Sequence, residues 1–425
     1  MKIKEKLKKE KIETGDIIEI QNNNMKKQGI LMPHHKFSDE NTLTIKLENG
    51  YNIGLKVNNS TRIKLIKKQK KHTKQTKKIP YNEELPTISI ISTGGTISSY
   101  IDYKTGAVHP ATSSEEIAFL NPEIFEICNI KTKNAFQILS ENIKITHWQK
   151  LAKLIADELN NGSKGVIIPH GTDTMGYTAA ALSFMLKNLT GPVVLVGSQR
   201  SSDRPSSDAK LNLLNAAIVA SKSDIGEVVI VMHKDTSDKI TAINRGVRTK
   251  KFHTSRRDAF KTINEEPIGY VENNKIKLKN PYKKIQKGKV KTQTELEKEV
   301  SMIYYYPGLQ PKDIHEKKGI VLIGTGLGHV SKDLITRLNE LNKKGSVIIM
   351  TSQCYFGRTN LNVYSTGREL LKNGVVPVDD MLAETAYVKL MWALANSKDK
   401  QEAILKMKEN IKGEMTKRTV HNSNI

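Results

Sequence analysis

The chain has 425 residues, of which 37% are hydrophobic and 26% charged, and its formal net charge at pH 7 is +24. At roughly 100–200 residues per domain, this length predicts two or three domains with a sizeable core. The composition excludes a collagen, a coiled coil and a fully disordered protein. No apolar run approaches the roughly 18 residues of a membrane helix, and the first 19 residues hold no apolar signal segment, so we expect a cytoplasmic protein without a membrane partner.

The sequence contains two cysteines, Cys128 and Cys354. Two cysteines cannot by themselves hold a metal cluster or form a disulfide framework. We interpret both as reduced core thiols, with one structural disulfide as the alternative.

Positive charge is concentrated in two segments. Residues 61–80 hold nine Lys or Arg and no acid, and residues 275–291 hold eight Lys and no acid. Blocks of like charge are typical of solvated linkers, but they also attract nucleic acids, whose phosphates they neutralise. A general Lys bias of the chain explains both runs as well, so contact with RNA and a compositional origin both stay open.

The first 66 residues have the pattern of short strands. Alternating or apolar runs lie at 17–20, 29–32, 42–47 and 51–57, and Asn49-Gly50 is a strong hairpin signal. We therefore expect a small antiparallel, β-barrel-like module over 1–66 and a basic linker over 67–85. Nothing in the module looks catalytic, which favours a role in docking or binding.

From residue 86 onward, short β-branched apolar runs end in polar turns. These runs lie at 87–92, 165–169, 192–196 and 226–232, and helical patterns such as 148–160 and 175–187 lie between them. Strands that alternate with helices predict a parallel sheet covered on both faces, which binds ligands beyond the carboxyl ends of its strands. We expect this domain to span 86–280 and to hold the active site.

The pattern is interrupted over 281–317, which we interpret as a linker, and then resumes. Runs at 319–323 and 345–350 end in polar turns, 379–396 has a helical pattern, and the tail after Gly413 looks loose. A second, smaller α/β domain over 318–425 is therefore expected. The predicted fold class is α/β, with a small antiparallel β module ahead of two domains that contain parallel sheets.

Two of the polar turns carry hydroxyl groups. Thr-Gly-Gly-Thr at 93–96 places two glycines where the backbone can approach a ligand closely, with amides that can serve an oxyanion, although a tight structural turn is the simpler interpretation. His-Gly-Thr-Asp-Thr-Met at 170–175 sets a hydroxyl beside a carboxylate, although Asp173 is equally suited to cap a helix. Thr is a weak nucleophile until a base or a cation activates it.

With Pro-Val-Val-Leu-Val-Gly-Ser-Gln-Arg at 192–200 and Ser-Gln-Cys at 352–354, these turns resemble the asparaginase/glutaminase family over about 85–412. The stretch 251–260 and the extra N-terminal module resemble one branch of it, the GatD subunits of archaeal glutamyl-tRNA(Gln) amidotransferases. This resemblance implies an amidohydrolase that releases ammonia from L-glutamine, or L-asparagine, for a GatE-like subunit that converts Glu-tRNA(Gln) to Gln-tRNA(Gln). It also implies two asparaginase-like domains.

The resemblance implies a role for each of four catalytic residues. Thr96 is the expected nucleophile, which attacks the side-chain amide carbon and forms an acyl-enzyme. Thr172, Asp173 and Lys251 match a second catalytic cluster, in which Lys251 tunes the Thr172 hydroxyl. Asp173 would orient Lys251 or the α-amino group of the substrate.

The substrate-binding residues follow from the same resemblance. Tyr103 matches a Tyr on a flexible loop and would help to shift the proton of Thr96. Ser140 and Glu141 match the segment that binds the carboxylate and amino groups of the substrate. Amides around Gly171 and after Thr93 are the expected oxyanion donors.

The resemblance further implies a homodimer within a heterotetramer. This chain would need no cofactor and no metal, since ATP and Mg²⁺ would belong to the partner subunit. Two alternatives stay open: a free L-asparaginase with a fused β module, and a catalytically silent scaffold that docks tRNA.

Overall fold

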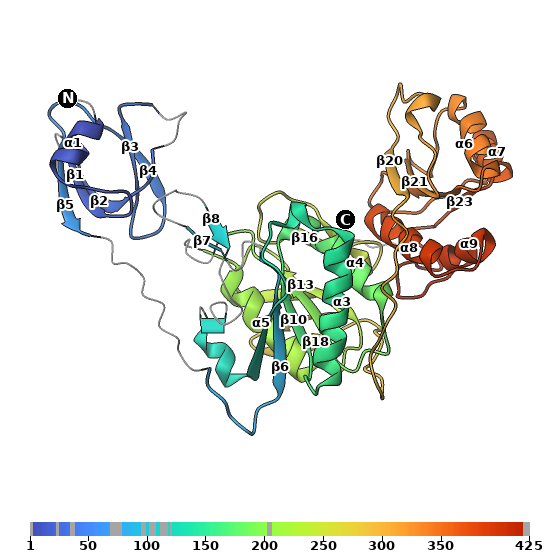
Figure 1. Cartoon of the computed structure of the whole chain (residues 1–425), viewed down its shortest axis with the longest axis horizontal. Coiled ribbons are helices and arrows are strands. Elements are labelled where there is room, and N and C mark those ends of the chain that lie inside the picture. Colours follow the sequence, from blue (N-terminus) through green and yellow to red (C-terminus); the bar gives the residue numbers. More distant parts are fainter. Residues whose placement is uncertain are drawn as a thin grey trace.

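The computed structural model describes residues 3–22, 25–34, 39–68, 79–94, 99–101, 108–110, 118–119, 121–201 and 206–419. Figure 1 shows a small β module, a large α/β domain and a smaller α/β domain, in chain order. No helix in the described ranges is long and apolar enough to cross a membrane.

The N-terminal module is a five-stranded antiparallel sheet in the order β4-β3-β2-β1-β5. Its alternating strands turn Ile18, Ile20 and Ile45 inward, where they are fully buried. The hairpin expected at Asn49-Gly50 joins β3 to β4. The elements are α1 (Ile3–Lys9), β1 (Ile17–Asn22), β2 (Met25–Leu31), β3 (Thr42–Lys46), β4 (Asn52–Lys56) and β5 (Arg62–Lys67).

The large domain is built on an eight-stranded sheet in the order β18-β17-β14-β13-β12-β10-β6-β9. The strands from β9 to β13 in this order are parallel, as expected, whereas β14, β17 and β18 are antiparallel. Their bounds are β6 (Thr87–Ser92), β9 (Asn129–Asn134), β10 (Val166–Pro169), β12 (Val193–Val196), β13 (Val228–His233), β14 (Ile240–Arg245), β17 (Gly269–Glu272) and β18 (Lys275–Leu278).

The sheet is therefore mixed, which corrects the expectation of a purely parallel one. β17 and β18 form a hairpin whose two turn residues, Asn273 and Asn274, both have positive φ, the backbone that such two-residue turns require. β18 also lies inside the Lys-rich run. Its lysines are exposed on the edge strand, a position where charge discourages pairing with another chain.

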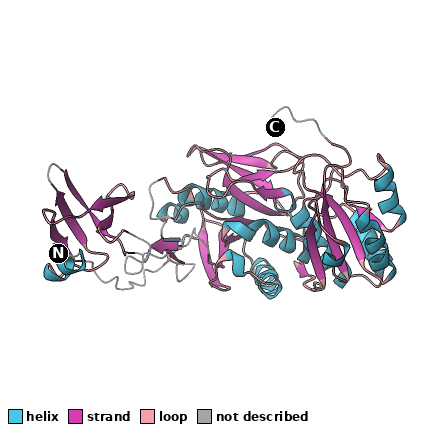
Figure 2. Ribbon diagram, turned by 90° about the horizontal axis from the view of Figure 1, so that it is seen from above, coloured by secondary structure: helices cyan, strands magenta, loops and turns pink. Residues whose placement is uncertain are grey.

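Helices cover both faces of this sheet (Figure 2). Adjacent residues of one strand face opposite cores: Ile90 packs into the cluster around α5, whereas Ile91 packs into the cluster around α3 and α4. The helices are α3 (Ile145–Asn160), α4 (Met175–Met185) and α5 (Ala209–Lys222). Three two-stranded sheets complete the domain: β7 (Ser99–Ile101) with β8 (Val108–Pro110), β11 (Leu186–Lys187) with β19 (Lys291–Thr292), and β15 (Thr249–Lys251) with β16 (Phe260–Thr262).

The smaller domain has four parallel strands in the order β20-β21-β22-β23. β20 falls within 281–317, which the sequence predicts as a linker, because this edge strand is only half apolar and half exposed. The elements are β20 (Val300–Tyr304), β21 (Gly319–Gly324), β22 (Val347–Ser352), β23 (Val375–Pro377), α6 (Asp333–Lys343), α7 (Ser365–Lys372), α8 (Ala383–Ala395) and α9 (Lys400–Lys408).

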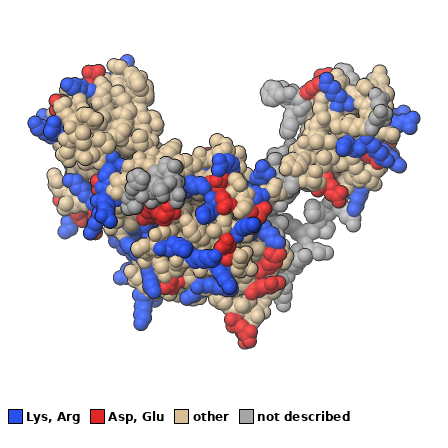
Figure 3. Space-filling view, turned by 180° about the vertical axis from the view of Figure 1, so that it is seen from behind, with Lys and Arg blue, Asp and Glu red and all other residues tan. Residues whose placement is uncertain are grey.

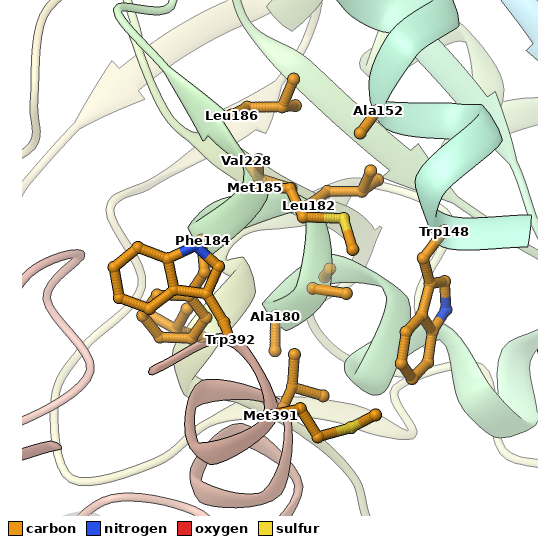
Figure 4. Packing of buried hydrophobic residues seen from close by; sticks show 14 of the residues in the cluster. Trp148, Ala152, Ala180, Leu182, Phe184, Met185, Leu186, Val228, Met391 and Trp392 are labelled. Atoms are coloured by element: carbon orange, nitrogen blue, oxygen red, sulfur yellow. The ribbon is translucent and has the colours of Figure 1, made fainter. Parts of the chain in front are cut away.

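One hydrophobic core joins the two α/β domains. α4 packs on α8, and Figure 4 shows Phe184 of α4 beside Trp392 of α8. Their rings stack with centroids 5.8 Å apart. The smaller domain is thus anchored to the helix that begins next to the candidate site.

Two expectations about the C-terminal part are wrong. The tail after Gly413 is not loose, because Glu414 is fully buried and forms a 2.5 Å ion pair with Lys389 of α8. Cys354 is exposed rather than a core thiol, whereas Cys128 is buried. Both cysteines are free, so they do not form the alternative disulfide.

Candidate functional site

The candidate residues follow neighbouring parallel strands. β6, β10 and β12 are adjacent in the sheet, so their carboxyl ends lie along one edge. The turn after β6 contains Thr93, whose hydroxyl donates a 2.8 Å hydrogen bond to the Pro169 carbonyl at the end of β10. This bond draws the first two turns together at the place where such sheets bind ligands.

Lys251 joins the turn after β10 from a distant part of the chain. Its ammonium donates to Thr172 Oγ1 at 2.8 Å and to Asp173 Oδ1 at 2.7 Å. The Lys251 side chain is 16% exposed, whereas that of Asp173 is 68% exposed. The carboxylate therefore fixes the lysine from the solvent side, and the lysine can exchange a proton with the Thr172 hydroxyl.

The same contacts decide between the two interpretations of Asp173. Asp173 lies in the short 3-10 helix η4 (Thr172–Thr174), and the N-cap of α4 is Thr174, which makes no side-chain capping bond. The Asp173 carboxylate contacts Lys251 instead. The ion pair, and not helix capping, explains this residue.

Ser140 lies against the turn after β10. It begins the 3-10 helix η3 (Ser140–Asn142), is buried, and its carbonyl accepts a 2.8 Å hydrogen bond from Thr174 Oγ1. A Cβ on Gly171 would lie 2.6 Å from the Cβ of Ser140, so the close approach requires glycine. Glu141 follows Ser140 and is exposed. The structure thus brings Gly171, Ser140 and the Thr172 turn together.

The turn after β6 has its own requirement for glycine. Gly94 has φ +99°, and a Cβ there would lie 2.6 Å from the Ile138 carbonyl oxygen. This conformation directs the chain into residues 95–98, which include Thr96. Both Thr96 and Tyr103 lie outside the described residues, so their predicted roles stay predictions.

His170 supports the site without a predicted role. It is fully buried, and burial lowers its pKa from 6.5 to about 4. The ring is therefore neutral at pH 7, and its Nδ1 donates a 2.6 Å hydrogen bond to the Gly171 carbonyl. Its place between a buried strand and a glycine is the signal in the sequence.

Asp208 is a second supporting residue that sequence reasoning missed. It is fully buried at the start of α5, and its carboxylate accepts bonds of 3.0 Å from the backbone amides of Gln199 and Arg200. These bonds fix the turn after β12. The sequence signal, an acid just ahead of a helical pattern, does not reveal that the acceptor serves another turn.

The described residues contain no group of three or more His, Cys, Asp and Glu side chains that could hold a metal ion. The chemical groups in place are a lysine ammonium, a hydroxyl and a carboxylate. This set suits proton transfer and acyl transfer.

Comparison with known families divides the chain into three matched regions. Residues 12–66 match the GatD N-terminal domain, 87–284 the N-terminal asparaginase domain, and 299–407 the glutaminase/asparaginase C-terminal domain. Solved structures with the same fold include the thermostable L-asparaginase from Thermococcus kodakarensis, which is 31% identical with a TM-score of 0.70 and matches 78% of this chain and 100% of its own. L-asparaginase I from Vibrio cholerae is 28% identical with a TM-score of 0.68 and matches 78% of this chain and 99% of its own.

Full-length relatives extend the match through the N-terminal module. The glutamyl-tRNA(Gln) amidotransferase D subunit from Pyrococcus furiosus is 50% identical over 100% of this chain and 99% of its own length. Its counterpart from Thermococcus kodakarensis is 50% identical over 92% of this chain and 90% of its own length. The chain therefore belongs to the GatD family of glutamyl-tRNA(Gln) amidotransferase subunits, which carry an asparaginase-like fold behind an N-terminal β module.

Proposed function

We propose that this chain is the glutaminase subunit that supplies ammonia to a tRNA-dependent amidotransferase. The observation that carries the proposal is the contact of Lys251 with both Thr172 and Asp173 at the carboxyl edge of the sheet. Family membership supports it, since the relatives are subunits of an enzyme named for amide transfer to glutamyl-tRNA(Gln).

In the proposed reaction, Thr96 Oγ attacks the side-chain amide carbon of L-glutamine. The C–N bond breaks, the leaving nitrogen takes a proton and departs as ammonia, and an ester to Thr96 remains. Tyr103 would help to move the proton of Thr96. Amides near Gly171 and after Thr93 would stabilise the oxyanion of each tetrahedral intermediate.

The second half of the reaction would use the described cluster. Water attacks the ester carbon, which releases glutamate and returns the proton to Thr96. Lys251 and the Thr172 hydroxyl would pass the protons that this step moves, and Asp173 would hold Lys251 or the α-amino group of the substrate. Ser140 and Glu141 would bind the polar groups at the α-carbon, a role that their position beside Gly171 supports.

The ammonia would pass to a GatE-like partner that activates Glu-tRNA(Gln) with ATP and Mg²⁺. We further propose a homodimer of this chain within a cytoplasmic heterotetramer. The basis is that the relatives are named as single subunits of a larger enzyme, which implies further subunits beside this one.

A free L-asparaginase with a fused module is the second candidate. Its support is the likeness to L-asparaginase structures over 78% of this chain. That likeness leaves out the N-terminal module, which matches the GatD N-terminal domain. The module therefore favours the amidotransferase component over the free enzyme.

The test uses the chain assembled with its partner subunit, with either glutamine or ammonium chloride as nitrogen donor for Glu-tRNA(Gln). Thr96→Ala should abolish amidation with glutamine and leave amidation with ammonium unchanged. Thr292→Ala, on the exposed strand β19, is the control and should behave as wild type with both donors. Full activity of Thr96→Ala with glutamine would instead indicate a silent scaffold that docks tRNA.

A further inference from the structure

The segment that leads into Lys251 is held by the start of α8. Thr385 Oγ1 donates a 2.8 Å hydrogen bond to the Val247 carbonyl. Glu384, the preceding residue of α8, forms an ion pair with Lys250. Lys251 belongs to the large domain, yet the four residues before it are fastened to the smaller one.

Arg248 makes the central connection within this segment. It is fully buried, and its Nη1 lies 3.1 Å from Asp380 Oδ2 and 3.2 Å from the Asp380 carbonyl oxygen. Its Nε donates a 2.9 Å hydrogen bond to the Gly413 carbonyl. A buried guanidinium stays charged and requires fixed acceptors, so Arg248 binds the loop before α8 and the C-terminal segment to one point.

The strand that carries Lys251 has little other lateral support. β15 pairs only with β16 in the described part of the chain, in a two-stranded sheet apart from the large one. A two-stranded ribbon is marginal without packing against another element. The contacts with α8 and its preceding loop supply that packing.

We propose that Arg248, Glu384 and Thr385 are positioning residues that hold β15 so that the Lys251 ammonium reaches Thr172 and Asp173. The inference rests on the proposed amide hydrolysis, and it makes the smaller domain part of the site. A shift of α8 moves the Lys251 backbone, and a shift of about 1 Å in a reacting group lowers a rate by about 100-fold.

The test variants keep the fold and change single contacts. Thr385→Val keeps the shape of the side chain but cannot donate to Val247, and Thr385→Ser restores the donor. Glu384→Gln removes the charge that pairs with Lys250. Ser346→Ala is the control, because it removes a comparable 2.6 Å hydroxyl–carbonyl bond, to Lys317, elsewhere in the smaller domain.

The first readout is steady-state ammonia release from glutamine by the complex. Thr385→Val and Glu384→Gln should each lower kcat by about tenfold with KM within about twofold, because the substrate still binds while the lysine is displaced. Thr385→Ser and Ser346→Ala should keep the wild-type kcat. A purely structural role would not produce this rescue by Ser with an unchanged KM.

The second readout does not depend on activity. A pulse of acetic anhydride on the full chain, followed by peptide mass spectrometry, measures how exposed the Lys251 amine is. Thr385→Val and Glu384→Gln should raise acetylation of Lys251 several-fold over wild type and Ser346→Ala. If acetylation rises but wild type hydrolyses no amide, the proposed function fails and the positioning role stands. Wild-type acetylation and kcat in both variants would overturn the inference.

Discussion

Lys251 donates to two acceptors at once, and the loss of either partner leaves its amine misplaced. Lys251→Ala or Asp173→Ala should lower ammonia release by about 100-fold or more, the contribution typical of a positioned proton-transfer group. The fold should persist, because an ion pair with a carboxylate that is 68% exposed contributes at most about 1 kcal/mol. Ammonia release together with the circular dichroism spectrum checks both statements.

Lys261→Ala provides the matched control on the neighbouring strand β16. Lys261 pairs with Asp258 at 3.3 Å and has no contact with Thr172 among its described bonds. It should retain wild-type activity. Wild-type rates in Lys251→Ala and Asp173→Ala would return both residues to structural roles.

His170 predicts how stability depends on pH. Its pKa is 6.5 when unfolded and about 4 when folded, so between these values the unfolded chain binds more protons. Its contribution to stability is present above pH 6.5 and is lost as the pH falls toward 4. This pKa difference corresponds to about 3 kcal/mol.

Urea unfolding at pH 7 and pH 4.5 measures this loss. His170→Asn cannot titrate, so its stability should fall less between the two pH values than that of wild type. The difference between the two proteins isolates His170 from the other groups that titrate in this range. Equal losses in both would contradict a buried, neutral His170.

The turn after β10 is the element that gathers the site, and Gly171 is its tightest point. Gly171 has φ −65°, which any residue adopts, so Gly171→Ala tests the steric contact with Ser140 alone. The added methyl should lower the free energy of unfolding by about 1–3 kcal/mol, as overpacking does. It should also lower ammonia release, because it displaces η3 from the turn.

Gly54→Ala in β4 is a suitable comparison for the same change. A Cβ there would meet only a Thr42 methyl group at 3.1 Å. Urea unfolding and ammonia release should both stay close to wild type. A Gly171→Ala protein that matches Gly54→Ala in both measurements would refute the close approach of Ser140.

Strands whose residues are buried on both faces are the elements best predicted from the sequence. β6, β10, β12 and β13 are rich in Ile and Val, and every residue of β10, β12 and β13 is buried. Edge strands such as β18 and β20 are missed because they alternate apolar with exposed side chains, which in a Lys-rich segment resembles a linker. The apolar pattern reports burial, and edge strands are only half buried.

The candidate site is predictable to the same extent. The turn at 170–175 can be placed from its strand, but the spacing of residues cannot bring Lys251 to Thr172 across 79 positions, and only the resemblance does so. Asp208 and Arg248 are missed because their partners are backbone groups and side chains of distant elements. Such contacts depend on the tertiary fold and leave no local pattern.

At the scale of the whole molecule, the C-terminal segment joins the two α/β domains. Glu414 accepts bonds from the amides of Ile411 and Lys412 and pairs with the fully buried Lys389. Gly413, beside it, accepts from Arg248 of the large domain. The segment therefore holds both domains through buried charges.

Glu414→Gln tests this connection. It leaves the Lys389 ammonium buried without its carboxylate, which should lower the free energy of unfolding by about 3–5 kcal/mol. Glu340→Gln is the control, since its exposed pair with Arg337 is worth at most about 1 kcal/mol. Denaturant unfolding measures both, and a loss below about 1 kcal/mol for Glu414→Gln would show that the segment does not bind the domains together.

The positive charge of the chain is widely distributed. On the face shown in Figure 3, Lys and Arg side chains lie among Asp and Glu. Within the run 275–291, Lys277 pairs with Glu272 and Lys284 with Asp224, so part of this run neutralises acids of its own domain. The compositional origin and contact with RNA thus both remain compatible with the surface.

The central claim is that the chain releases ammonia for a partner. The most direct test is ammonia release from glutamine and from asparagine, first by the purified chain and then with the partner subunit and Glu-tRNA(Gln). The account predicts a chain that is silent alone and hydrolyses glutamine in the complex. Rapid asparagine turnover by the chain alone, unchanged by the partner, would contradict it and identify a free asparaginase.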